Sequence, residues 1–120
     1  MNEKITAKAW LEGGIAVYTK QLNKFGESFA ENPALALGRS DDTFKIAAKL
    51  HMNQRVLQCV TDGHSIKVII AELDKEILFK AENPISSTSQ PSNLMERYIL
   101  SATAELMREL KMIGDHLVAI

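Results

Sequence analysis

The chain contains 120 residues, of which 46% are apolar and 24% are charged. This length and composition are typical of a soluble globular protein, so we expect a single domain over residues 1–120. The net charge of −1 and the 6% content of aromatic residues do not favour an extended basic face or a base-stacking platform, so no nucleic-acid partner is expected.

A single cysteine, Cys59, excludes an internal disulfide. The first ten residues lack an apolar run and a small-residue cleavage site, so they do not resemble a signal peptide. No window contains the roughly 18 consecutive apolar residues that a membrane-spanning helix needs. These features favour a cytoplasmic protein without a membrane partner.

A long amphipathic helix is predicted from Glu3 to Glu31. Its large apolar residues recur at spacings of four and three, which is typical of one buried helical face. They are Leu11, Ile15, Tyr18, Leu22, Phe25 and Phe29. Gly13 and Gly14 interrupt the pattern and either break the helix or allow another backbone to approach closely. We favour a continuous helix, with room for a kink near Gly13, that ends at Asn32 because the following proline disfavours helical backbone there.

The stretch from Phe44 to Asn53 is ambiguous, and its interpretation decides the fold class. Its composition favours a helix, because it is rich in alanine, lysine, leucine and methionine. Its apolar residues alternate, however, and alternation puts them on one face of a strand but scatters them around a helix. The alternating residues are Phe44, Ile46, Ala48, Leu50 and Met52. We favour the strand. The alternative is a helix from Asp42 to Cys59, capped by Ser40 or Asp41.

A hairpin signal follows this stretch. The runs 55–60 and 65–73 flank the sequence Thr61-Asp62-Gly63-His64, and Asp-Gly between two such runs is typical of a tight β-turn. Residues 75–81 resemble one more strand. Because an isolated hairpin would be marginally stable, we predict a four-stranded antiparallel meander from Thr43 to Ala81.

A loop and a second long helix complete the chain. Residues 82–93 contain two prolines and four serines, which favours a loop. Asn93 is a suitable N-cap for a helix that continues to the last residue. The apolar seam of this helix consists of Ile99, Ala102 or Thr103, Leu106, Leu110, Ile113, Leu117 and Ile120.

The predicted fold is therefore α+β: a long N-terminal helix, the four-stranded meander and a long C-terminal helix, with both helices packed on one face of the sheet. The apolar face of the last helix is wider than this packing covers. The residues that widen it are Met95, Tyr98, Leu100, Met107 and Met112. A second copy of the chain would cover the surplus, so we expect a homodimer. The candidate interface residues are Tyr98, Leu110, Leu117 and Ile120.

No motif in the sequence identifies a reaction. His51, His64 and His116 do not have the spacing of a zinc site, and turn or capping roles explain the last two. Cys59 has no cationic residue beside it in the sequence that would activate a thiolate. We therefore predict no catalytic residue, no metal site and no cofactor, and the chain is not expected to be an enzyme.

Two classes of function remain. The first is a non-enzymatic interaction module, an adaptor, chaperone or regulator that binds a protein partner through a helix or sheet face. The second is a binding protein or enzyme that holds a small apolar ligand in a pocket between sheet and helices. The candidate lining residues are Met52, Phe79, Met107 and Met112, because methionine and aromatic side chains form pliable apolar walls.

Overall fold

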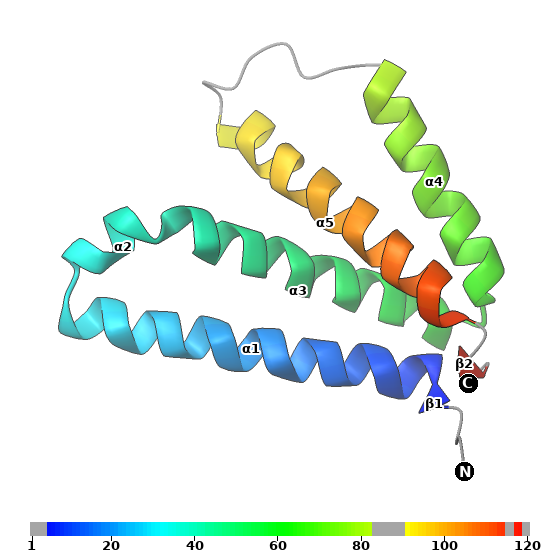
Figure 1. Ribbon diagram of the computed structural model, residues 1–120, viewed down its shortest axis with the longest axis horizontal. Coiled ribbons are helices and arrows are strands. Elements are labelled where there is room, and N and C mark those ends of the chain that lie inside the picture. Colours follow the sequence, from blue (N-terminus) through cyan, green and yellow to red (C-terminus); the bar gives the residue numbers. More distant parts are fainter. Residues whose placement is uncertain (1–4, 83–90, 115–116, 119–120) are drawn as a thin grey trace.

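The computed structural model describes residues 5–82, 91–114 and 117–118 of the chain (Figure 1). The helices in this part are α1 (Ala7–Glu31), α2 (Ala34–Gly38), α3 (Ser40–Thr61), α4 (Ile66–Glu82) and α5 (Pro91–Ile113). Two very short strands, β1 (Ile5–Thr6) and β2 (Leu117–Val118), pair in parallel, with Ile5 opposite Leu117. The fold is therefore a helical bundle.

The helices are arranged in space in the order α1, α3, α5, α4 (Figure 1). α3 lies at the centre and packs against α1 on one side and α5 on another, whereas α4 packs mainly on α5. α1 and α3 form an antiparallel pair joined through α2. α3 and α4 follow each other closely in sequence but diverge in space, so they share few contacts.

The predicted meander over Thr43–Ala81 is wrong, and with it the α+β class and the packing of helices on a sheet. α3 and α4 occupy these residues. The alternative helix from Asp42 to Cys59 is confirmed, although the observed helix α3 extends two residues further at each end. Its predicted caps are wrong, because Ser40 and Asp41 lie inside α3 and Arg39 precedes the helix.

The alternation in α3 has a different origin from that of a strand. Alternate residues lie about 200° apart around a helix, and therefore on nearly opposite faces. The row on the α5 side consists of Phe44, Ala48 and Met52. Ile46 and Leu50 share a face with Asn53, which lies against Gly14 of α1. Because α3 has a helix on each of these two faces, both rows are apolar and together they imitate a strand.

The Asp-Gly pair ends a helix and does not form a hairpin. Gly63 has a φ of 96°, a left-handed conformation that favours glycine. The N–H of His64 donates to the carbonyl of Cys59 and the N–H of Gly63 to that of Val60, each at 3.0 Å, which is a Schellman motif. Ser65 then caps α4, because its Oγ accepts the backbone N–H three residues later at 3.2 Å. A tight β-turn and this helix ending both require glycine with positive φ, so the dipeptide alone does not distinguish them.

A long helix near each end of the chain is confirmed, and α1 is continuous through both glycines. The predicted outer bounds are wrong, because Ile5 and Thr6 form β1. In addition, α5 begins at Pro91, before the predicted cap Asn93, and ends at Ile113, so that Leu117 lies in β2.

α1 begins after Thr6, whose Oγ1 accepts the N–H of Ala9 at 3.0 Å. A Cβ on Gly14 would lie 3.0 Å from Oδ1 of Asn53, whereas a Cβ on Gly13 would meet nothing within 4 Å. Gly14 therefore allows the close approach of α1 and α3.

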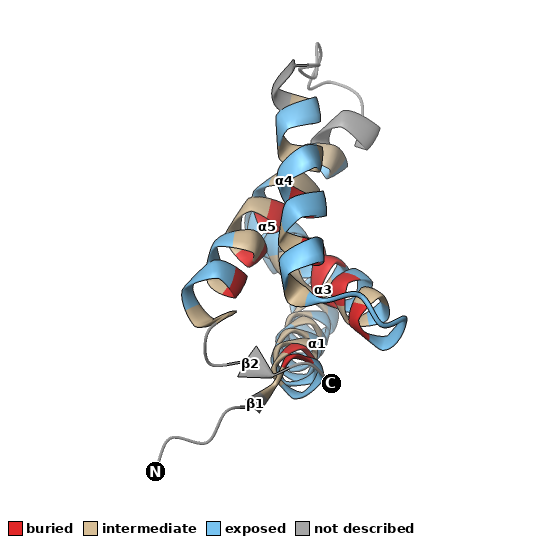
Figure 2. Cartoon of the chain, turned by 90° about the vertical axis from the view of Figure 1, so that its right-hand side faces the viewer, coloured by how far each residue is buried: buried red, intermediate tan, exposed pale blue. Residues whose placement is uncertain are grey.

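The hydrophobic core lies at the end of the bundle where β1 and β2 meet, which we call the packed end. The largest fully buried side chains are Leu11, Met52, Val56, Val60 and Leu110. Figure 2 looks at the molecule from this end and shows the buried residues on the helix faces that meet in the interior. The central part of the seam predicted for α5 is confirmed here, because Ala102, Thr103, Leu106 and Leu110 are all buried. Ile99 and Ile113 are only half-buried, and Leu117 lies beyond the helix in β2.

The opposite end of the bundle, which we call the open end, holds the second half of α1 and the first halves of α3 and α5 (Figure 1). Throughout the described length of α1, no residue after Leu11 is fully buried. Phe25 and Phe29 stack on each other with ring centroids 5.9 Å apart, but both stay half-buried. The radius of gyration is 16.1 Å, whereas a compact domain of this length has about 14 Å. The bundle is therefore incompletely closed.

Candidate functional site

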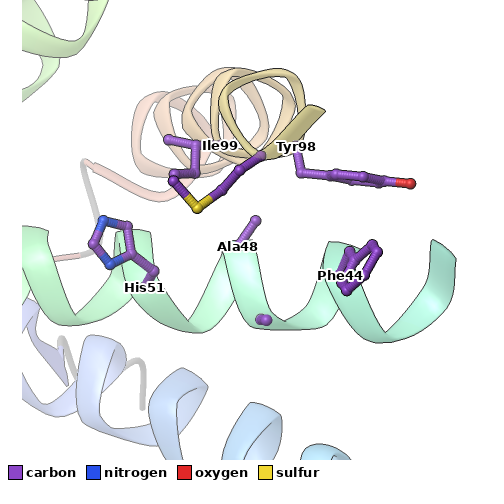
Figure 3. Close-up of a pocket in the computed structure, with 7 residues that line it drawn as sticks. Phe44, Ala48, His51, Tyr98 and Ile99 are labelled. Atoms are coloured by element: carbon purple, nitrogen blue, oxygen red, sulfur yellow. The ribbon is translucent and has the colours of Figure 1, made fainter. Parts of the chain in front are cut away.

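An apolar groove lies between α3 and α5 at the open end (Figure 3). It has a volume of about 540 Å³ and is lined by Phe44, Ala47, Ala48, His51, Met95, Tyr98 and Ile99. Of these residues, only His51 and Tyr98 carry polar side-chain atoms. Phe44 and Met95 are 47% and 58% exposed, so large apolar side chains flank an open hollow. We call this feature the α3–α5 groove.

Helical register brings these side chains together. The α3 residues of the groove are spaced by three and four along the helix, so they form one stripe on the side that faces α5. Figure 3 shows Phe44 and His51 at the two ends of the hollow, with Ala48 between them and Ile99 and Tyr98 on the facing helix. The groove is deep at Ala48 because the side chain of this residue is a single methyl group. The hollow therefore results from small residues placed between large ones.

Tyr98 holds one wall of the groove in place. Its ring meets Phe44 edge-on, with centroids 5.7 Å apart and an interplanar angle of 64°. Its hydroxyl donates a hydrogen bond to Asp41, which also pairs with Lys45 at 2.9 Å. The hydrogen bond from Tyr98 and then the contact with Lys45 lower the pKa of Asp41, and the same bond raises the pKa of Tyr98. These contacts tie the first half of α5 to the start of α3.

Two further ion pairs flank the groove. Arg55, one turn beyond His51, donates to both carboxylate oxygens of Glu76 in α4, at 2.9 and 2.5 Å. This hydrogen bonding raises the pKa of Arg55. On the other wall, Lys80 of α4 lies 3.5 Å from Glu96 of α5. Because each of these carboxylates has a cation beside it, the surroundings of the groove carry little net charge.

A polar pocket of about 460 Å³ lies on the other side of the α3–α5 contact, and Tyr98 lines both spaces. Its charged lining residues are Lys45, Lys49, Arg97 and Glu105. Lys49 Nζ lies 3.3 Å from Glu105 Oε1, and Lys45 is already paired with a carboxylate of α3. Since two of the three cations are matched within the chain, this pocket does not favour an anionic ligand.

Glu109 of α5 and Tyr18 of α1 are both half-buried and interact electrostatically. Burial raises the pKa of the Glu109 carboxyl, and the neighbouring Glu105 raises it further. Burial also raises the pKa of Tyr18, with Glu109 as the next cause. Lys49 acts in the opposite direction on both groups. Packing of three helices accounts for these shifts, and neither residue lines the groove.

The structure does not bring together the four residues predicted to line a ligand pocket. Met52 is fully buried in the core, and Met107 packs against that core. Phe79 and Met112 are 60% and 74% exposed. None of the four lines the α3–α5 groove. The predicted pocket had a sheet as one wall, but helices α3 and α4 occupy the residues of that sheet.

The residues predicted for a dimer interface have different environments. Tyr98 lines the groove and is half-buried. Leu110 is fully buried within one chain, so it has no surface to offer a partner. Leu117 lies in β2, with its side chain outside the described part, and Ile120 is outside the described residues.

Sequence reasoning missed Ala47, Ala48 and His51 as site residues because it assigned them to a strand. With the helical period, Phe44, Ala47, Ala48 and His51 form a stripe at spacings of three and four, and this signal was present in the sequence. Met95 was recognised as surplus apolar surface, but no sequence pattern placed it opposite Phe44. Tertiary packing of α5 on α3 creates that proximity.

Side chains that could support catalysis are dispersed. His51 is exposed at the groove, His64 lies in the turn after α3, and Cys59 is half-buried against the core. Over residues 5–82, 91–114 and 117–118, no three His, Cys, Asp or Glu side chains are placed to hold a metal ion. Over the same ranges, no helix has both the length and the apolar content to cross a membrane. His116 lies outside the described residues.

No protein family, curated protein or solved structure matches the chain at a significant level of similarity.

Proposed function

We propose that this protein is a non-enzymatic interaction module that binds an apolar helical face of another polypeptide in the α3–α5 groove. The observation that supports it is an apolar hollow of about 540 Å³ flanked by the half-exposed side chains of Phe44 and Met95. Exposed apolar surface with a polar surround is typical of protein-binding sites. An adaptor, chaperone or regulator would use such a site.

The shape of the groove favours a helical partner. Two neighbouring helices present a furrow that a third helix fills with residues at positions i, i+3 or i+4, and i+7. On α3 the groove extends from Phe44 to His51, a distance of about 10 Å along the helix axis. A partner would therefore contribute about two helical turns, and the bundle would gain the helix that its open end lacks.

A small apolar ligand is the second candidate. The volume of about 540 Å³ falls within the range of ligand pockets, which is about 300–1,000 Å³. Ligand pockets usually bury most of the ligand surface, however. The exposure of Phe44 and Met95 would leave a ligand in this groove partly in contact with water, so the polypeptide is favoured.

We also propose a cytoplasmic location. The cysteine count supports it, because secreted chains of this size often carry several cysteines, whereas this chain has only Cys59.

Selection from a displayed library of helical peptides tests the proposed function. The target is the full chain, and the selected peptides are then measured against Ala47→Glu, which puts a charge in the groove, and against Ala16→Glu. Ala16 is also an exposed alanine within a helix, but it lies on α1 away from the groove, so it is the matched control. We expect peptides with apolar residues at i, i+3 or i+4, and i+7 that lose at least about tenfold affinity for Ala47→Glu alone, which is about 1.4 kcal/mol.

Amide chemical shifts locate the bound peptide. The proposed function predicts changes at residues 44–51 and 95–99. Peptides that bind all three proteins equally, or that shift resonances elsewhere, would contradict it. Binding of the apolar dye anilinonaphthalene sulfonate at these residues, with no peptide bound there, would instead support the second candidate.

A further inference from the structure

We infer that the polypeptide seated in the α3–α5 groove is a second copy of this chain, so that two chains pair groove to groove about a twofold axis. This inference rests on the proposed function and names its partner. Three properties of the chain carry it: the amount of exposed surface, the shape of the groove and the charges beside it.

The chain exposes enough surplus surface for a stable dimer. Its accessible surface is 8081 Å². A compact monomer of the same mass, 13.3 kDa, exposes about 6,500 Å². The difference of about 1,600 Å² exceeds the roughly 800 Å² that each partner contributes to a standard interface. A standard interface with a second copy would therefore remove about half of this surplus.

The groove is complementary to itself, as a twofold interface requires. Phe44 is half-exposed at one end of the groove, and Ala47 and Ala48 leave a hollow one turn further along α3 (Figure 3). If two copies cross near Ala47, each Phe44 ring enters the hollow of the other copy. The two alanines also allow the two α3 helices to approach closely.

The charges beside the groove permit this pairing. The neighbouring ion pairs are Asp41–Lys45, Arg55–Glu76 and Lys80–Glu96. Each pair lies within one chain, so two grooves that face each other present no excess of one sign and do not repel. For the same reason no charge selects a strongly acidic or basic foreign partner. The net charge of −1 per chain adds little long-range repulsion.

Sedimentation equilibrium of the full chain across the micromolar range tests the inference. We expect the wild type to form a dimer. Ala47→Glu should raise the dimer dissociation constant at least about a hundredfold, because the dimer would bury two unpaired carboxylates. Met95→Glu, at another exposed groove position, should act in the same direction, whereas Ala16→Glu should behave as the wild type. Circular dichroism verifies that each variant is folded. If Ala47→Glu is unfolded, the dissociation constant of Met95→Glu decides the test.

Spin labels identify the face that pairs. One label is attached after Gln54→Cys, at an exposed position on the same side of α3 as Ala47 but outside the groove lining. Another, in a separate protein, is attached after Ala16→Cys, and each substitution is combined with Cys59→Ala. The inference predicts a shorter distance between labels across the dimer for position 54 than for position 16, and a shorter distance for position 16 would overturn it.

The outcomes also separate this inference from the proposed function. A wild type that sediments as a monomer throughout the range, or a dimer that both groove variants leave intact, overturns the inference. If helical peptides still bind the groove in either case, the proposed function stands and only the identity of the partner is wrong. If no peptide binds there either, both are wrong.

Discussion

The packed end and the open end of this bundle are built from the same three helices, yet only one of them is closed. At the packed end, α1, α3 and α5 converge and bury Leu11, Met52 and Leu110 completely. At the open end, the same α3 and α5 leave Phe44 and Met95 about half exposed. The comparison shows that one helix pair supplies a core over part of its length and a binding surface over the rest, according to whether another helix covers it.

The two ends also differ in the kind of apolar residue they use. Aliphatic side chains such as Val56 and Val60 dominate the packed end. The groove at the open end is lined by two aromatic rings, a methionine, two alanines, an isoleucine and a histidine. Aromatic residues and methionine are enriched where proteins meet other proteins. The composition of the open end therefore agrees with the proposed role in binding.

The largest expected effect separates the two ends directly. Met52→Ala should lower the free energy of unfolding by about 2–5 kcal/mol, because it leaves a cavity in the packed core. Phe44→Ala should cost about 1 kcal/mol or less, because its ring is already half exposed and loses mainly the edge contact with Tyr98. Urea unfolding measures both. Equal losses would mean that the two ends are packed alike.

The next prediction concerns the contact between α1 and α3. Gly13→Ala should stabilise the protein by up to about 1 kcal/mol, because alanine favours helices and the site is open. Gly14→Ala should destabilise it by about 1 kcal/mol or more, because the added methyl meets Oδ1 of Asn53 at 3.0 Å. The Asn53 amide is buried and donates to the carbonyl of Lys49 at 2.8 Å, so it does not easily move away.

Thermal unfolding of these two variants is the measurement, and Gly13→Ala serves as the matched control. If both substitutions stabilise equally, the helices do not approach as closely at Gly14 as the structure indicates.

A smaller effect is expected where α4 is attached to α3. Glu76→Ala removes the two-point ion pair with Arg55, which is partly exposed, so the loss of stability should stay below about 1 kcal/mol. The local effect should be clearer: amides of α4 should exchange faster with solvent, because few other contacts link α4 to α3. Glu72→Ala, which removes the pair with Lys75 inside α4, is the control. Equal exchange in both variants would show that Arg55 does not anchor α4.

The smallest expected effect depends on pH. Because the folded-state pKa of Glu109 is raised, the folded chain binds this proton more tightly than the unfolded chain, and the ionised carboxylate opposes folding at neutral pH. Glu109→Gln should therefore stabilise the protein at pH 7, by less than about 1 kcal/mol because the group is only half-buried. The gain should vanish as the pH falls through the raised pKa and then below the ordinary carboxyl pKa of about 4.3. Thermal unfolding against pH measures it, and a gain that persists in acid would contradict this explanation.

The sequence predicted long helices at α1 and α5, though not their outer ends, because each has one dominant apolar seam. It failed for α3, where rows facing two different helices interleave and imitate a strand. It failed for α4 because residues such as Val68, Ile69 and Ile70 favour strands, and only burial at helical spacing, as at Ile69 and Leu73, reveals a helix. The groove was not predictable without α3, since α5 packed on α3 brings Met95 close to Phe44.

The short pairing of β1 with β2 has a practical consequence. Ile5 lies opposite Leu117 and Thr6 opposite Val118, so both strands meet at the packed end, away from the groove. A reporter group attached beside β1 or β2 would therefore leave the groove accessible. A covalent link between β1 and β2 would close a large loop at the packed end, and the resulting loss of unfolded-state entropy should raise the melting temperature without altering the groove.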